Sequence, residues 1–205
     1  MAVALPSKGR LRRCLAELRK ARDGAAIVEF ALAAPVFLMA LIGIFDVGYM
    51  AYATAVLHGA VQQAGRSSSL ETGDTSAADA YVTGVVQTVL PGAKVTTSRK
   101  SYFDFSNIAR PEAWNDANNN GRCDNGESYT DENDNGQWDA DVGKSGNGGA
   151  SDVVVYTVDV TYDPIFPNPF LDGSNGKRSL SASTVKKNQP FANQNALGSS
   201  AGTCD

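Results

Sequence analysis

The sequence predicts an α+β protein in which one long N-terminal helix packs on a small antiparallel sheet domain. Three observations predict this class. An apolar run begins at Ala25 and continues into a segment without strong helix breakers. Residues 151–162 are rich in β-branched residues, as expected of a strand, and residues 178–187 are expected to form the last strand. Residues 115–142 are rich in Asp, Asn and Gly, which indicates a loop insertion before these strands.

The first 24 residues differ in charge from the rest of the chain. They contain seven basic residues against two acidic residues, a net charge of +5, whereas the remainder contains eleven against twenty, a net charge of −9. Residues 25–45 follow as a mainly apolar segment, which as a helix would be about 31 Å long and would span a bilayer. The positive-inside rule then predicts a cytoplasmic leader and an exterior C-terminal portion.

Glu29 is the only charged residue of this apolar segment. A carboxylate inside a bilayer is costly unless it is neutralised or paired, so a functional role is expected for Glu29. A secretory signal peptide is disfavoured because the apolar run continues past Ala34 to Phe45. The alternative that stays open is an uncleaved anchor with Glu29 at the interfacial edge of the membrane.

The sequence that begins at Gly24, GAAIVEFALAAP, resembles the prepilin-type leader junction of TadE-like pseudopilins, minor pilins of the tight-adherence (Tad/Flp) branch of type IV pilus systems. The resemblance implies that a prepilin peptidase cleaves after Gly24, so that Ala25 becomes the N-terminus. Cleavage creates an α-amino group at Ala25 that can pair with Glu29 of a neighbouring subunit and set the register of assembly. Residues 45–49 and 62–66 resemble the family more weakly.

The resemblance also implies a location and partners. The protein is expected in the bacterial inner membrane, with its N-terminus in the cytoplasm and its C-terminus in the periplasm, before it joins a cell-surface pilus. The implied partners are other pilin and pseudopilin subunits through the N-terminal helix, the prepilin peptidase, the inner-membrane assembly platform and the lipid bilayer. No nucleic acid partner is expected.

The long helix is expected over residues 25–67, with Pro35 as the one strong breaker inside it. Small residues recur at spacings of three and four on its second half, which places them on one face that another helix can approach closely. The members of this small-residue face are Gly48, Ala51, Ala55 and Gly59. His58 has no partner at metal-ligand spacing and is interpreted as a structural or surface residue.

Residues 116–127, here called loop 1, fit the EF-hand calcium-loop pattern D-x-[DN]-x-[DN]-G-x5-E at every defined position. So many protein oxygens favour Ca²⁺ over Mg²⁺. No convincing amphipathic helices flank the loop, which resembles the tandem DxNxNG calcium loops of bacterial extracellular proteins. The expected ligands are Asp116, Asn118, Asn120, the backbone carbonyl of Arg122, Asp124 and Glu127.

The pattern recurs fifteen residues later in residues 131–142, here called loop 2. Its twelfth position is Val142, so Asp141 or a carboxylate from loop 1, such as Glu127, must complete any second site. One or two Ca²⁺ ions are therefore expected, and the alternative is a solvated acidic linker. The other expected ligands of loop 2 are Asp131, Asn133, Asn135, Gln137 and Asp139.

The rest of the chain supplies a helix and further strands to an exterior α+β domain over residues 68–192. The helix is expected at residues 76–90, and strands at 94–105, 151–162 and 178–187. A polar tail at residues 193–205 is expected to be disordered unless Cys204 is tied to Cys123. The exterior compartment permits that disulfide, whereas Cys14 lies in the leader.

Three functions compete on this evidence. The first is a minor pilin or pseudopilin that acts through leader removal and helix-driven assembly, with structural calcium. The second is a single-pass, membrane-anchored calcium-binding adhesion module that never enters a pilus. The third, a membrane-bound hydrolase that uses the acidic cluster, is the weakest because no nucleophile–base pair is visible. No catalytic residue is assigned.

Overall fold

The computed structural model describes residues 23–69, 74–165 and 176–205. It confirms the α+β class, because a long apolar helix is followed by a domain with a small antiparallel sheet. The chain divides into two compact units, residues 1–48 and 49–205. Most of the expected leader, including Cys14, lies outside the described residues.

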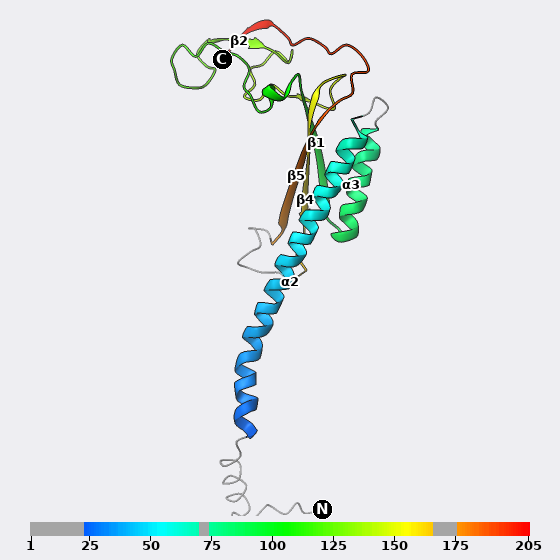
Figure 1. Ribbon diagram of the computed structural model, residues 1–205. Helices are drawn as coiled ribbons and strands as arrows, with labels where there is room; N and C mark the ends of the chain where they lie inside the picture. The colour runs from blue at the N-terminus through cyan, green and yellow to red at the C-terminus, as the bar shows by residue number, and fades with distance from the viewer. Residues whose placement is uncertain (1–22, 70–73, 166–175) are drawn as a thin grey trace, which may run out of the picture. The chain divides into compact units, whose positions relative to one another are not determined.

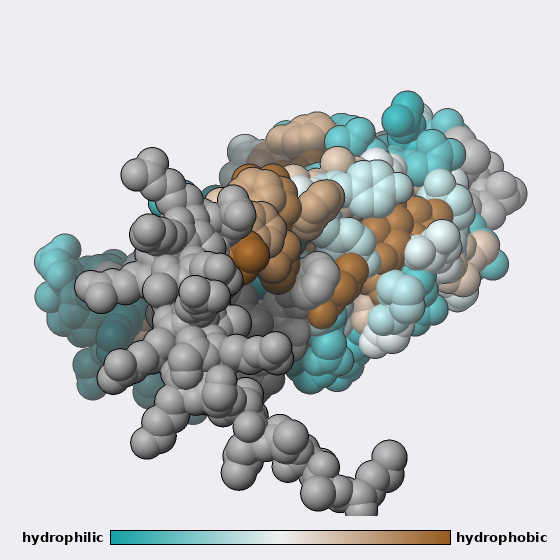
Figure 2. Space-filling model, turned by 90° about the horizontal axis from the view of Figure 1, so that it is seen from below, coloured by the Kyte–Doolittle hydropathy of each residue, from teal (hydrophilic) through white to brown (hydrophobic). Residues whose placement is uncertain are grey.

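Helix α2 spans Asp23–Ser67, close to the range expected from the sequence. It is long and apolar enough to cross a membrane, and its apolar window is not buried within the protein. Large apolar side chains are exposed on the part that belongs to the first unit, and brown, hydrophobic surface is visible in the view from below in Figure 2. Among these side chains are Ile27, Phe30, Leu32, Phe37 and Phe45.

The part of α2 from Tyr49 onward packs within the second unit. Helix α3 spans Thr75–Val89 and runs beside this part of α2 (Figure 1). The side chain of Asp74 caps α3 by accepting hydrogen bonds from the first backbone N–H groups of the helix. The hydroxyl of Tyr49 donates to the backbone carbonyl of Val89 and so ties the two helices together.

Four antiparallel strands form the main sheet in the order β3-β1-β4-β5. Tyr156 and the alternate valines of β4 are buried, because one face of the sheet packs on the helices. Gly65 of α2 lies so near β5 that an added Cβ would be 2.7 Å from the side chain of Thr184. The strands are β1 Lys94–Tyr102, β3 Lys144–Ser145, β4 Val153–Tyr162 and β5 Arg178–Lys187.

An ion pair connects α3 to this sheet. Arg99 of β1 donates to both carboxylate oxygens of Asp79, at 2.6 and 2.9 Å, and Tyr156 of β4 donates to the same carboxylate at 2.6 Å. The guanidinium of Arg99 also lies 4.2 Å from the ring centre of Tyr156. Burial acts to raise the pKa of Asp79, but the hydrogen bonds and charge of its partners hold it below its usual value.

A second, two-stranded sheet pairs β2 (Ser128–Asp131) with β6 (Ser200–Thr203). A short 3-10 helix, η1 (Phe105–Asn107), precedes the loops. The C-terminal tail is therefore not wholly irregular, because part of it forms β6 and is fixed against the segment between loop 1 and loop 2.

Candidate functional site

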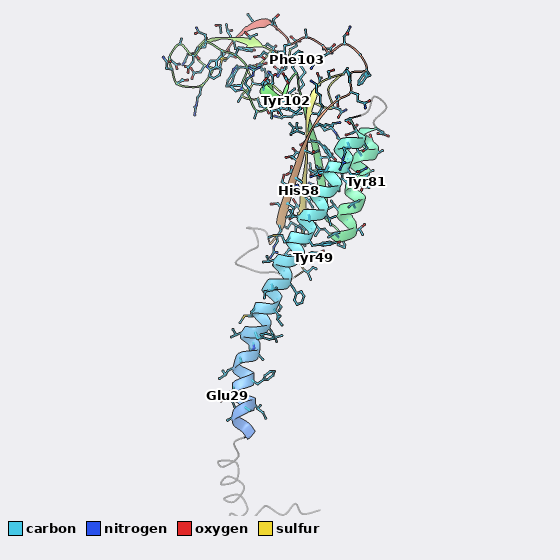
Figure 3. The ribbon with its side chains drawn as sticks, in the orientation of Figure 1. Glu29, Tyr49, His58, Tyr81, Tyr102 and Phe103 are labelled. Atoms are coloured by element: carbon cyan, nitrogen blue, oxygen red, sulfur yellow. A yellow bond between two sulfur atoms is a disulfide. The ribbon has the colours of Figure 1, made fainter. Side chains whose placement is uncertain are left out.

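The first candidate site is the head of α2, where Gly24, Ala25 and Glu29 occupy the first turns and are exposed. Figure 3 labels Glu29 near the N-terminal end of the helix. None of the ion pairs formed among the described residues involves Glu29. The carboxylate is therefore available to a group from outside the described chain.

The small-residue face of α2 is also exposed along its whole length, at Gly48, Ala51, Ala55 and Gly59. The domain instead packs on another face of the helix, through side chains such as Leu57 and Val61. His58, which Figure 3 labels, is exposed in agreement with its interpretation as a surface residue.

Hydrogen bonds from backbone N–H groups to the side chains of its first and last positions organise loop 1. The two carboxylate oxygens of Asp116 accept from the backbone N–H groups of Asn120 at 3.0 Å and Gly121 at 2.9 Å. Gly121 has φ +75°, a left-handed conformation that glycine adopts without steric cost. Glu127 closes the loop, because its carboxylate accepts from the N–H groups of Ala117 at 2.9 Å and Asn118 at 3.3 Å.

Loop 2 repeats this geometry. Asp131 accepts from the backbone N–H groups of Asn135 at 3.1 Å and Gly136 at 2.7 Å. The side-chain amides of Asn133 and Asn135 both donate to Asp139, at 2.7 and 2.5 Å. The positive φ values at Asn119 and Gly121 recur in loop 2 at their equivalents, Asp134 and Gly136, whereas those at Asn125 and Gly126 do not recur. The sequence repeat is therefore also a repeat of backbone conformation in the first half of each loop.

The side chain expected to complete loop 2 lies elsewhere. Asp141 accepts from Lys100 at 2.6 Å and from the hydroxyl of Tyr102 at 3.1 Å, so it is bound to β1. Glu127 remains in loop 1. The carboxylate that reaches loop 2 is Glu112, which is fully buried and which the sequence pattern missed. It precedes loop 1 in the chain, so no spacing rule within one loop could have found it.

The charges around loop 2 are predominantly negative. Burial raises the pKa of Tyr129, and the charges of Asp131, Glu112 and Asp139 raise it further. In the part of the chain that the structure describes, no three His, Cys, Asp or Glu side chains gather to hold a metal ion on their own. A cation in either loop would therefore also need amide and backbone oxygens, as this loop pattern provides.

A disulfide joins Cys123 of loop 1 to Cys204, with the Cα atoms 5.5 Å apart. Backbone hydrogen bonds reinforce the connection, since the N–H of Cys204 donates to Glu127 and its carbonyl accepts from Gly126, both at 2.8 Å. This is the disulfide that the sequence offers as a candidate.

Comparison with known proteins identifies the helix and leaves the exterior domain without a match. The family model described as TadE-like protein matches residues 24–66, from the glycine at the head of α2 to one residue before its end. No curated protein and no solved structure matches the chain. The match covers α2 and shows what this helix is similar to.

Proposed function

We propose that the protein is a minor pilin or pseudopilin of a Tad-type pilus. It is inserted in the bacterial inner membrane through α2 and assembles into, or at the tip of, a surface filament that serves adhesion. The observation that carries this proposal is that the family match and the prepilin-like junction both begin at Gly24, and that the exposed apolar helix follows this residue.

After leader removal, Glu29 would set the position of one subunit relative to its neighbour. Cleavage by a prepilin peptidase after Gly24 removes the basic leader and leaves an α-amino cation at Ala25. In apolar surroundings an unpaired carboxylate is strongly disfavoured, so the subunit position in which Glu29 meets a neighbouring amine is preferred. The exposure of both residues leaves them accessible to such a neighbour.

The exposed small-residue face supports the same assembly. With side chains no larger than a methyl group at Gly48, Ala51, Ala55 and Gly59, a second helix can approach closely and gain dispersion contacts along the face. In this proposal α2 packs on its own domain through one face and on other subunits through another.

Calcium would act in the exterior domain as a structural ion. The residues of loop 1 fit Ca²⁺ because their donors are all oxygens and their conformation is set by Gly121 and by the hydrogen bonds to Asp116. When bound, the ion would neutralise the crowded carboxylates. The disulfide supports a location of this domain outside the cytoplasm, where such bonds persist.

A second candidate function is a single-pass, membrane-anchored calcium-binding adhesion module that does not enter a pilus. The observation that favours it is the end of the family match at Arg66, which leaves the whole loop-bearing domain outside the similarity. In that case Glu29 would have no role in assembly.

Substitution of Glu29 separates the two candidates. In cells with an active Tad system, we expect Glu29→Gln to remain in the membrane and to be lost from sheared filaments. Asp159→Asn, which neutralises an exposed carboxylate on β4, is the matched control and should be recovered like the wild type. Absence of the wild type and of both variants from sheared filaments, with all three retained in the membrane, would favour the anchored module. Recovery of Glu29→Gln at the wild-type level would remove the assembly role of Glu29.

A further inference from the structure

We propose that loop 2 is a second calcium site whose closing carboxylate is Glu112, supplied by the segment that precedes loop 1. This second ion presupposes the structural calcium of the proposed function but does not depend on pilus assembly. The site would take a hard divalent cation with oxygen ligands from two separate segments of the chain.

Glu112 makes the same contacts in loop 2 as Glu127 makes in loop 1. Each glutamate accepts through one oxygen from the backbone N–H groups of the second and third loop positions, and through the other oxygen from that of the ninth. The donors in loop 1 are Ala117 at 2.9 Å, Asn118 at 3.3 Å and Asp124 at 3.4 Å. The donors in loop 2 are Glu132 at 2.8 Å, Asn133 at 3.2 Å and Asp139 at 3.1 Å.

This equivalence places Glu112 at the position from which an EF-hand-type loop supplies its bidentate carboxylate. The N–H bonds fix the orientation of the carboxylate, and Oε2, which accepts only one of the three, retains lone-pair capacity for a cation. Val142, which occupies the twelfth position of loop 2 in the sequence, is a buried apolar residue that packs with Tyr102 and Val153. The chain therefore replaces the missing ligand in space rather than in sequence.

Asn133 provides an independent indication of a ligand in loop 2. Asn133 is only 7% exposed, and its side-chain oxygen Oδ1 has no hydrogen-bond partner among the described residues. Its Nδ2 donates to Asp139 at 2.7 Å, so the side chain lies against the loop's own carboxylate. A buried carbonyl without a partner costs roughly 1–3 kcal/mol, and a cation held at the third loop position would satisfy it.

Loop 1 offers an informative contrast. There the equivalent amide oxygen, on Asn118, accepts from the backbone N–H of Asn120 at 2.9 Å, and the residue is exposed. Loop 2 is the more buried of the two, with Asp131 5% exposed and Glu112 not exposed at all. Buried carboxylates require a compensating charge. The adjacent Arg110 forms its ion pair with Glu132 and acts on Glu112 through its charge.

An ion in loop 2 would also hold the segment before loop 1. The backbone of Glu112 is already bound to this loop, because its N–H donates to Asp139 at 3.0 Å and its carbonyl accepts from the indole of Trp138 at 3.2 Å. Trp138 in turn contacts Trp114 edge to face, with ring centres 5.2 Å apart. Calcium at this point would clamp both ends of loop 1.

The test is calcium titration by isothermal calorimetry of the full chain in detergent, after removal of bound metal with a chelator. We expect the wild type to bind two ions and Glu112→Gln to bind one, with the second weakened roughly 100-fold or more. Glu127→Gln should lose the other ion. Asp141→Asn is the matched control and should still bind two, since Asp141 is bound to β1.

Asn133→Asp keeps the test decisive if Glu112→Gln does not fold. A carboxylate at the third position should tighten one of the two sites by about tenfold, because added ligand charge raises Ca²⁺ affinity. The proposal would be overturned if folded Glu112→Gln still bound two ions. It would also be overturned if Asp141→Asn lost an ion, or if Asn133→Asp bound calcium with unchanged affinities. If the wild type binds a single ion and Glu127→Gln loses it, the proposal of a site in loop 2 is overturned and the calcium site of loop 1 stands. A wild type without calcium would also remove structural calcium from the proposed function.

Discussion

Removal of the Cys123–Cys204 disulfide tests how the exterior domain holds its C-terminus. The two cysteines are 81 residues apart, so the crosslink restricts a long loop of the unfolded chain. The chain-entropy relation assigns a loop of this size about 4.5 kcal/mol of stabilisation at 25 °C. For a domain of this size, a loss of that magnitude corresponds to a fall in Tm of roughly 9–18 °C.

The loss should be concentrated around loop 1. Without the crosslink, β6 is held mainly by its short ladder with β2 and by the hydrogen bonds of Cys204. We therefore expect faster hydrogen exchange in these strands and weaker calcium binding by loop 1. The helices and the main sheet, which lie in a separate core cluster, should keep their protection.

The assay is thermal unfolding and hydrogen exchange of Cys123→Ser/Cys204→Ser in detergent. Cys14→Ser is the matched control, since it removes the remaining cysteine without touching the crosslink. Equal Tm values for the double variant and the control, with unchanged exchange in β2 and β6, would refute the reasoning.

Three further perturbations address other parts of the structure. Asp79→Asn should cost about 2 kcal/mol in urea unfolding, because it leaves the largely buried Arg99 without its ion pair. Folding lowers the pKa of Asp79, so the stabilisation from this ion pair is complete above the usual pKa of 3.8 and is lost as the pH falls below that value. A destabilisation by Asp79→Asn that does not change with pH would contradict this linkage. Gly65→Ala should be about 1–3 kcal/mol less stable than the control Gly59→Ala, because a Cβ at position 65 meets the side chain of Thr184 on β5 and a Cβ at position 59 meets nothing within 4 Å. Equal stabilities of the two variants would contradict this packing. In a mixture with wild-type subunits, Glu29→Gln should be under-represented in filaments relative to the membrane, as measured by quantitative mass spectrometry, and equal ratios would argue against an alignment role.

Local patterns were sufficient for most elements of the fold. The apolar run and the absence of strong breakers other than Pro35 predicted α2, and Pro91 and Gly92 correctly marked the end of α3. Residues 178–187 form β5 with the expected bounds, and β4 lies within the expected residues 151–162, whose many β-branched residues give a strong strand signal. The C-terminal tail was harder to predict, since β6 depends on pairing with β2, some seventy residues earlier.

The candidate site shows the same division between local and long-range information. Loop 1 carries its pattern within twelve residues, so Asp116 and Glu127 could be paired from sequence alone. The closure of loop 2 by Glu112 could not, because the carboxylate and its partners come from segments on opposite sides of loop 1. The nearby Asp141 was the natural expectation, but Lys100 and Tyr102 on β1 bind it instead.

We propose that the mature subunit begins at Ala25 and that its new amine meets Glu29 of a neighbour. The N-terminal sequence and the intact mass of the protein recovered from sheared surface filaments test this proposal. We expect a chain that starts at Ala25 and lacks residues 1–24. Recovery of filament protein that still begins at Met1 and retains Gly24 would contradict it.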